Sequence, residues 1–182
     1  MFGNTRSFRI CIALFVLIGP AAVLTVYAQD KELADIKYKE DYDRIQSITK
    51  IGDIAKRADK MVALYSEERD MDSKLRDYAD SLFARDLETM NKQGNLSALK
   101  SICERILKVR PKFGEVYLFY GVALKNEKKM DEALNAFARG SAIPNQLQAK
   151  AKQQLDLAYR AAHGGSLVGQ DKFVKEAMKD LK

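Results

Sequence analysis

The stretch that decides the fold is GEVYLFYGVALKNEKKMDEALNAFARGSAIPNQL, residues 114–147. Its apolar residues recur at spacings of three and four, which is typical of amphipathic helices. Lys128 and Lys129 mark a polar turn within it, and Pro144 follows its last apolar turn. The stretch therefore predicts one helix over 113–125, a short turn, and a second helix over 131–141 that stops before the proline.

The same spacing continues on both sides of this stretch, whereas alternating strand-like patterns are scarce, so an all-α chain is predicted. Asp53 is a good N-cap for the helix that follows it, and Gly94 and Asn95 end a later one. The polar segment 66–72 is compatible with a turn or with a solvated part of a longer helix. Further helices are expected at 31–50, 96–109, 146–162 and 170–181.

A self-similarity of 34 residues runs through the second half of the chain. At this shift Phe83 aligns with Tyr117, Leu99 with Ala133, and Cys103 with Phe137. In this respect the sequence resembles the tetratricopeptide repeat, a helix–turn–helix unit with small residues where its helices cross and a proline at its end. In the best copy, 114–147, the residues that match the family pattern are Tyr117, Tyr120, Gly121, Leu124, Ala133 and Phe137.

The resemblance implies repeats over 80–113, 114–147 and a degenerate 148–182. The first departs from the pattern at Leu87, where the family has a small glycine, and at Cys103, which takes an aromatic position. Residues 29–79 fit no frame and are expected to form an N-terminal helical pair that covers the first repeat. The implied fold is all-α, with antiparallel helical hairpins stacked as a short solenoid; the alternative is an irregular helical bundle with the same core.

The first 28 residues have the layout of a secretory signal peptide. They carry Arg6 and Arg9 but no acidic residue, followed by an apolar run that Gly19 and Pro20 interrupt. Cleavage is expected after Ala28, which predicts an exported protein, periplasmic or secreted. An uncleaved membrane anchor over residues 10–28 is the alternative, because the run approaches the length that spans a bilayer.

Little in the sequence points to catalysis, so no enzyme, cofactor or metal site is expected. His163 is the only histidine and lies beside two glycines, as expected of a surface turn. Cys103 occupies an apolar helical face and is expected to be a core residue. The 31 basic and 25 acidic residues are interleaved, which argues against nucleic acid as a partner. Phosphate-binding loops and CxxC motifs are absent from the sequence.

The predicted function is that of a protein-binding scaffold, with a membrane-anchored structural component of a cell-envelope assembly as the alternative. The family resemblance implies that a partner protein or peptide binds the concave side formed by the first helix of each repeat. The candidate residues on that side have a slight basic excess, which favours a partner bearing some acidic residues. The Lys and Asn arrangement that clamps a terminal carboxylate in some family members is not reproduced. The candidate partner-binding residues are Glu88, Lys92, Leu118, Val122, Lys125, Asn126, Lys152, Tyr159 and Arg160.

Overall fold

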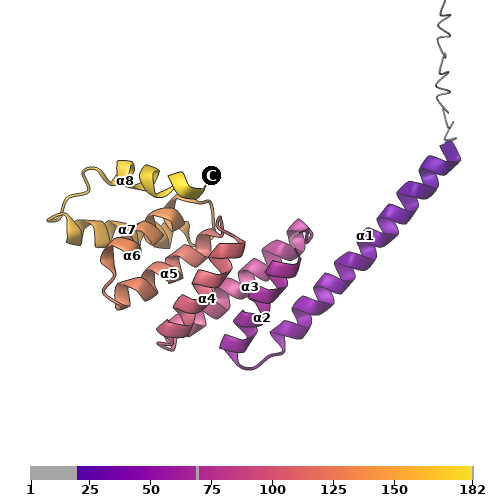
Figure 1. The fold of residues 1–182 in the computed structure, drawn as a ribbon, viewed down its shortest axis with the longest axis horizontal. Helices are drawn as coiled ribbons and strands as arrows, with labels where there is room; N and C mark the ends of the chain where they lie inside the picture. The colour runs from indigo at the N-terminus through magenta and orange to yellow at the C-terminus, as the bar shows by residue number, and fades with distance from the viewer. Residues whose placement is uncertain (1–19, 69, 182) are drawn as a thin grey trace, which may run out of the picture. The chain divides into compact units, whose positions relative to one another are not determined.

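The computed structural model describes residues 20–68 and 70–181, and its regular secondary structure there is entirely helical (Figure 1). The predicted all-α class is therefore confirmed, and the helices pack against their neighbours in a repeat-like arrangement. In chain order the elements are α1 (Pro20–Thr49), α2 (Ile54–Glu67), α3 (Ser73–Lys92), α4 (Leu96–Val109), α5 (Gly114–Asn126), α6 (Met130–Ala142), α7 (Gln148–Ala162), α8 (Gln170–Ala177) and the short 3₁₀ helix η1 (Lys179–Leu181).

The chain divides into two compact units, residues 1–37 and 38–182, with the boundary inside α1. In the first unit, residues 20–37 are helical throughout. Most of the predicted signal peptide, residues 1–19, lies outside the described residues. Among the helices that are described, each is too short or too polar to span a bilayer.

Local capping signals place several helix ends where the sequence predicts them. The side chain of Asp53 caps α2 by accepting a hydrogen bond from the backbone N–H of Lys56 at 3.0 Å. Asp72 caps α3 in the same way, accepting from the N–H of Lys74 at 2.9 Å. The undecided segment 66–72 is divided: Ser66 and Glu67 complete α2, Asp70 lies in a turn, and the Asp72 N-cap starts α3.

Three helix ends differ from expectation by two residues or more. The helix predicted over 31–50 is longer than expected: α1 begins at Pro20, so its first turns lie within the segment predicted as a signal peptide. Helix α7 begins at Gln148 and not at residue 146, because the side chain of Asn145 accepts from the N–H of Leu147 at 2.7 Å and holds a turn there. The last helix was expected to reach residue 181. It ends at Ala177, and the tighter 3₁₀ turn of η1 follows it, with the N–H of Leu181 bonded to the carbonyl of Met178.

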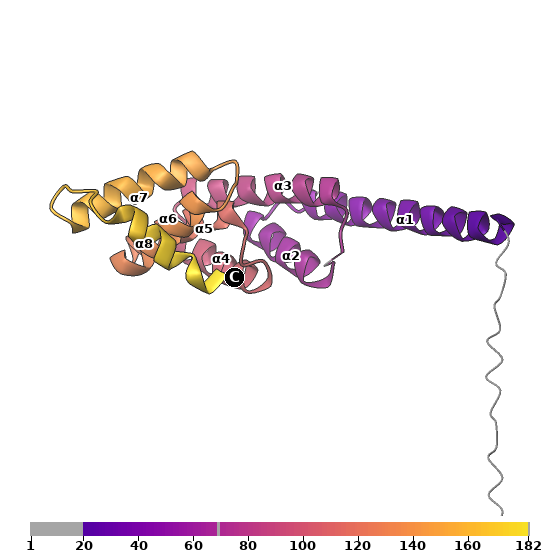
Figure 2. The ribbon, with the colours of Figure 1, turned by 90° about the horizontal axis from the view of Figure 1, so that it is seen from above.

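Within residues 38–182 the helices form successive antiparallel hairpins (Figure 2). Helices α3, α5 and α7 lie side by side along one face, while α2 packs on α4 and α6 on α8 on the other. The second half of α1 joins the first of these rows, since Tyr42 stacks on Tyr78 of α3 with ring centroids 6.5 Å apart. The segment for which an N-terminal helical pair was predicted, residues 29–79, contains most of α1, all of α2 and the start of α3.

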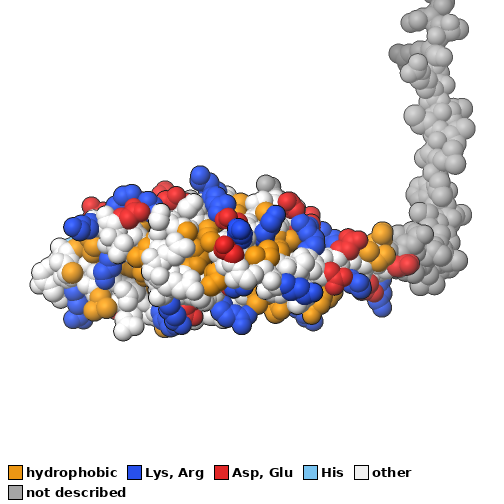
Figure 3. Space-filling model, turned by 90° about the horizontal axis from the view of Figure 1, so that it is seen from below, with side chains coloured by type: hydrophobic (Ala, Val, Ile, Leu, Met, Phe, Trp, Pro, Cys, Tyr) orange, Lys and Arg blue, Asp and Glu red, His pale blue; other side chains and the backbone are white. Residues whose placement is uncertain are grey.

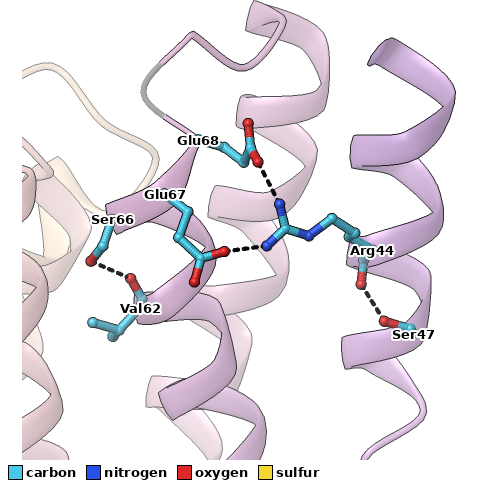
Figure 4. A network of polar contacts seen from close by, with 6 residues as sticks. All are labelled: Arg44, Ser47, Val62, Ser66, Glu67 and Glu68. Atoms are coloured by element: carbon cyan, nitrogen blue, oxygen red, sulfur yellow. Dashed lines mark hydrogen bonds and ion pairs between the residues drawn. The ribbon is translucent and has the colours of Figure 1, made fainter. Parts of the chain in front are cut away.

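Arg44 ties this first hairpin together (Figure 4). Its guanidinium reaches from α1 to the end of α2, where it donates to Glu67 at 2.5 Å and also to Glu68. Beneath this polar contact, Ile45 and Ile48 of α1 are buried in the core. The first hairpin thus has an apolar interior and charged side chains paired on its outer side. Its buried residues belong to the same hydrophobic core as those of the following helices.

Helix α5 joins the two halves of the hydrophobic core. Val116 and Phe119 pack with residues of α1–α4, whereas Leu118 and Leu124 pack with α6–α8. A helix that is apolar on most of its circumference must be covered on several sides. This burial explains why the 114–147 stretch carries the strongest sequence signal.

Helices α5 and α6 are in close contact at Gly121 and Ala133, as expected, but Gly121 faces Phe137 and not Ala133. A Cβ atom on Gly121 would lie 2.5 Å from Cε1 of Phe137, so the ring of α6 occupies the space that a side chain on α5 would need. Ala133 is fully buried in the same cluster. Cys103 is also fully buried, as predicted for a core residue.

Candidate functional site

A groove runs along the face formed by α3, α5 and α7, and we call it the odd-helix groove. Its N-terminal half is a cavity of about 920 Å³, lined by the first half of α3, the α4–α5 turn, the start of α5 and the α6–α7 turn. Its C-terminal half is a cavity of about 450 Å³, lined by the end of α3, the middle of α5 and the first half of α7. Glu88 and Leu147 line both halves, so the two cavities adjoin each other along this face, and we treat them together as the groove.

The C-terminal half combines an apolar floor with polar rims. Leu118, Phe119 and Val122 of α5 form the floor. The rims are polar side chains from the two flanking helices: Asn91 and Lys92 from α3, and Lys150, Gln153 and Gln154 from α7. An apolar centre with a hydrated polar rim is the usual composition of a protein–protein contact surface.

Charges across this half are unevenly balanced. Lys92 Nζ lies 3.2 Å from Oε1 of Glu88 on the same helix, and Lys150 Nζ of α7 lies 4.0 Å from the same oxygen. Two ammonium groups therefore share one carboxylate. Elsewhere, acidic and basic side chains are interspersed over the face that Figure 3 presents, with apolar side chains between them.

The N-terminal half is walled by a polar network between α2, α3 and the α4–α5 turn. Asp80 accepts from the Tyr65 hydroxyl at 2.7 Å and from Nη2 of Arg110 at 2.8 Å. The Arg110 guanidinium also lies over the rings of Tyr65 and Phe113, 4.7 and 4.3 Å from their centroids. Burial, with a smaller contribution from the Asp80 charge, raises the pKa of Tyr65 well above its ordinary value. This wall is thus held by hydrogen bonds, an ion pair and contacts with aromatic rings.

The opposite wall is supplied by the turn that precedes α7. Asn145 packs so closely on the start of α5 that a Cβ on Gly114 would lie 2.4 Å from its Nδ2. One residue on, the backbone N–H of Gln146 donates to the Glu115 carboxylate at 3.1 Å. The start of the third hairpin is therefore attached to the start of the second, and together they form one side of the groove.

The structure brings together four of the predicted partner-binding residues. Glu88, Lys92, Leu118 and Val122 all line the C-terminal half of the groove. Two others, Lys125 and Asn126, are exposed at the end of α5, about one turn beyond Val122, and do not line either half.

The three predicted residues on α7 lie elsewhere. Tyr159 is buried, with its ring stacked on His163 at 3.9 Å between centroids and its hydroxyl donating to the carbonyl of Val168 at 3.2 Å. Lys152 donates to Gln170 of α8 at 2.8 Å, and Arg160 is exposed without lining the groove. These side chains serve the contact of α7 with the final turn and α8, or project into solvent.

The groove face of α7 is displaced by one residue from the frame that the family resemblance implies. Lys150, Gln153 and Gln154 line the groove, and Leu157 continues this stripe one turn further with 55% of its surface exposed. One residue turns a helix face by about 100°. In the sequence, the spacing of three and four that joins Lys150, Gln153, Gln154 and Leu157 was the signal that could have identified this stripe.

Other chemistry-bearing side chains are dispersed. His163 is exposed in the turn after α7, as predicted, and its Nδ1 lies 2.9 Å from the carbonyl oxygen of Tyr159. In the part of the chain that the structure describes, no cluster of three His, Cys, Asp or Glu side chains is arranged to hold a metal ion. Burial raises the pKa of the Cys103 thiol, which keeps it protonated.

No protein-family model, curated protein or solved structure matches this chain. The functional interpretation consequently depends on the geometry of the odd-helix groove.

Proposed function

We propose that this protein is a non-enzymatic interaction module that binds a segment of a partner protein in the odd-helix groove. The observation that carries the proposal is the continuity of the groove across three successive hairpins, with the apolar floor of α5 between two polar rims. Apolar contacts at the floor supply affinity, and charged or amide side chains at the rims supply orientation.

The dimensions of the groove favour a polypeptide ligand. The two halves together extend from the second turn of α3 to its last turn, from Asp77 to Lys92. At 1.5 Å rise per residue, these fifteen steps of helix correspond to roughly 22 Å. A fully extended peptide of about seven residues has this length, since each residue spans at most about 3.3–3.6 Å.

Site-specific photo-crosslinking in the native cell tests the proposal. A photoreactive amino acid at Gln153 places the crosslinker on the groove rim, where the side chain is exposed and has no hydrogen-bond partner among the described residues. Lys175 on α8, exposed and outside the groove, is the matched control position. We expect a discrete partner to crosslink from position 153 and not from position 175.

The crosslink should also depend on the groove floor. Replacing Val122 by aspartate introduces a charge on the floor at a partly exposed position, and the crosslink from position 153 should weaken while the thermal melt is retained. Equal crosslinking from both positions, or a crosslink that persists in the folded Val122→Asp protein, would show that the groove is not the binding surface.

A further inference from the structure

Glu88 occupies a distinctive place in the odd-helix groove. It lines both halves, and its Oε1 faces Lys92 on α3 at 3.2 Å and Lys150 on α7 at 4.0 Å. The pair with Lys150 therefore crosses the groove above α5, from one rim to the other. The floor residue Leu118 lies in the same cavity.

The ion pairs of Glu88 with Lys92 and Lys150 contribute little to stability. The side chains of Glu88, Lys92 and Lys150 are 42%, 70% and 62% exposed, and exposed ion pairs contribute little to stability because water screens them. Neither lysine has another ion-pair partner among the residues that the structure describes. The two ammonium groups thus retain one net positive charge beside an apolar floor, and a second carboxylate would be attracted to it.

The rims also carry unused hydrogen-bonding capacity. The side-chain amides of Asn91, Gln153 and Gln154 line the same cavity and form no hydrogen bond with the described residues. Each amide offers both donors and an acceptor. An extended peptide needs such partners for its backbone N–H and C=O groups, whereas a helical ligand satisfies most of its own.

Building on the proposed function, we infer that the C-terminal half of the groove binds an extended internal peptide segment in which an aliphatic residue lies next to an acidic one. The aliphatic side chain packs on Leu118 and Val122. The acidic side chain takes the place of Glu88 between Lys92 and Lys150. Glu88 therefore competes with the acidic residue of the peptide, because its own carboxylate lies between Lys92 and Lys150 while the groove is empty.

Peptide selection on the full-length protein tests this inference. A displayed library of random dodecapeptides supplies the probes, and selected peptides are synthesised and titrated by fluorescence anisotropy. We expect enrichment of Leu, Ile or Val beside Asp or Glu, and tolerance of proline at flanking positions, since proline is compatible with an extended chain but not with a helix interior. Hydrogen exchange should show protection of residues 88–92, 118–122 and 150–154 when a peptide binds.

If Glu88 competes with the peptide, changes at Glu88 and at the two lysines should have opposite effects on peptide affinity. Glu88→Gln should tighten binding of the selected peptides about two- to five-fold, the range that corresponds to one exposed ion pair. Lys92→Gln and Lys150→Gln should each weaken it by a similar factor. Glu132→Gln on α6 and Lys175→Gln on α8, both exposed and outside the groove, should change nothing.

The outcomes separate this inference from the proposed function. If selected peptides protect the three groove segments but are basic or have helical periodicity, or if Glu88→Gln fails to tighten binding, the inference is overturned and the proposed function stands. If the selection returns no peptide that protects these segments, both are overturned.

Discussion

Replacing Gly121 with alanine is expected to destabilise the fold, although alanine is the better helix former. The new Cβ would lie 2.5 and 2.6 Å from Cε1 and Cδ1 of Phe137, distances that real side-chain contacts essentially never show. Phe137 is fully buried, so its ring has no free space into which it can move. Overpacking of this kind costs about 1–3 kcal/mol.

Helix propensity opposes this cost. Alanine in place of glycine favours a helix interior by about 0.8–1.0 kcal/mol, so the net loss for Gly121→Ala is roughly 0–2 kcal/mol. Because the net value depends on two opposing effects, the single variant is a weak test. Phe137→Leu makes the test decisive, since the smaller side chain leaves space that the new methyl group on α5 can fill.

Urea unfolding of the two single variants and the double variant measures the coupling. We expect the double variant to be more stable than the sum of the single changes predicts, by an interaction energy within the range of about 0.5–3 kcal/mol typical of residues in contact. Gly52→Ala is the control, because a Cβ at Gly52 would meet nothing within 4 Å. Strict additivity of Gly121→Ala and Phe137→Leu would refute the close contact between α5 and α6.

Three further expectations concern other buried groups. Cys103, whose thiol pKa is raised by burial, should react with a thiol reagent only on unfolding; rapid labelling of native Cys11→Ser protein would contradict its core position. The Arg57 guanidinium donates to Asp86 at 2.5 and 2.7 Å, so Asp86→Ala removes its carboxylate partner and should lower the free energy of unfolding in urea by about 3 kcal/mol. Adding Arg57→Met should restore most of this stability, and a lack of recovery would disprove the pairing. In the folded protein the pKa of Tyr65 is raised above its unfolded value of about 10, so its stabilising contribution is present below pH 10 and is lost as the pH rises further. Between pH 9 and 11 the melting temperature should therefore fall less steeply for Tyr65→Phe than for the parent protein.

The sequence predicts the helices well because their ends depend on neighbouring residues. Asp53 caps α2 through a hydrogen bond to a residue three positions away, and Gly94 adopts the positive φ of 73° that ends α3. Signals of this kind are local and can be read without knowledge of the tertiary structure. The exceptions are the start of α1, the start of α7 and the end of α8. At the start of α7 the side chain of Asn145 forms a turn that the helical periodicity does not reveal.

The candidate site is only partly accessible from the sequence. The faces of α3 and α5 follow the 34-residue period, and Glu88, Lys92, Leu118 and Val122 indeed lie together. The rotation of α7 depends on tertiary contacts, since Tyr159 is drawn into the core by the turn that precedes α8 and by Phe173. A period fitted to earlier repeats cannot register these contacts, because they involve the last hairpin and the longer turn within it.

The attachment of Gln146 to Glu115 has a consequence for how such a module can be divided or transplanted. Since one side of the cleft between α3 and α5 is supplied by residues that lead into α7, no single hairpin contains the whole odd-helix groove. The smallest continuous segment that contains the whole groove runs from α3 through α7. Duplication of one hairpin within the chain would add a helix to this face. The residues that line the new cleft would come from the two hairpins that meet there.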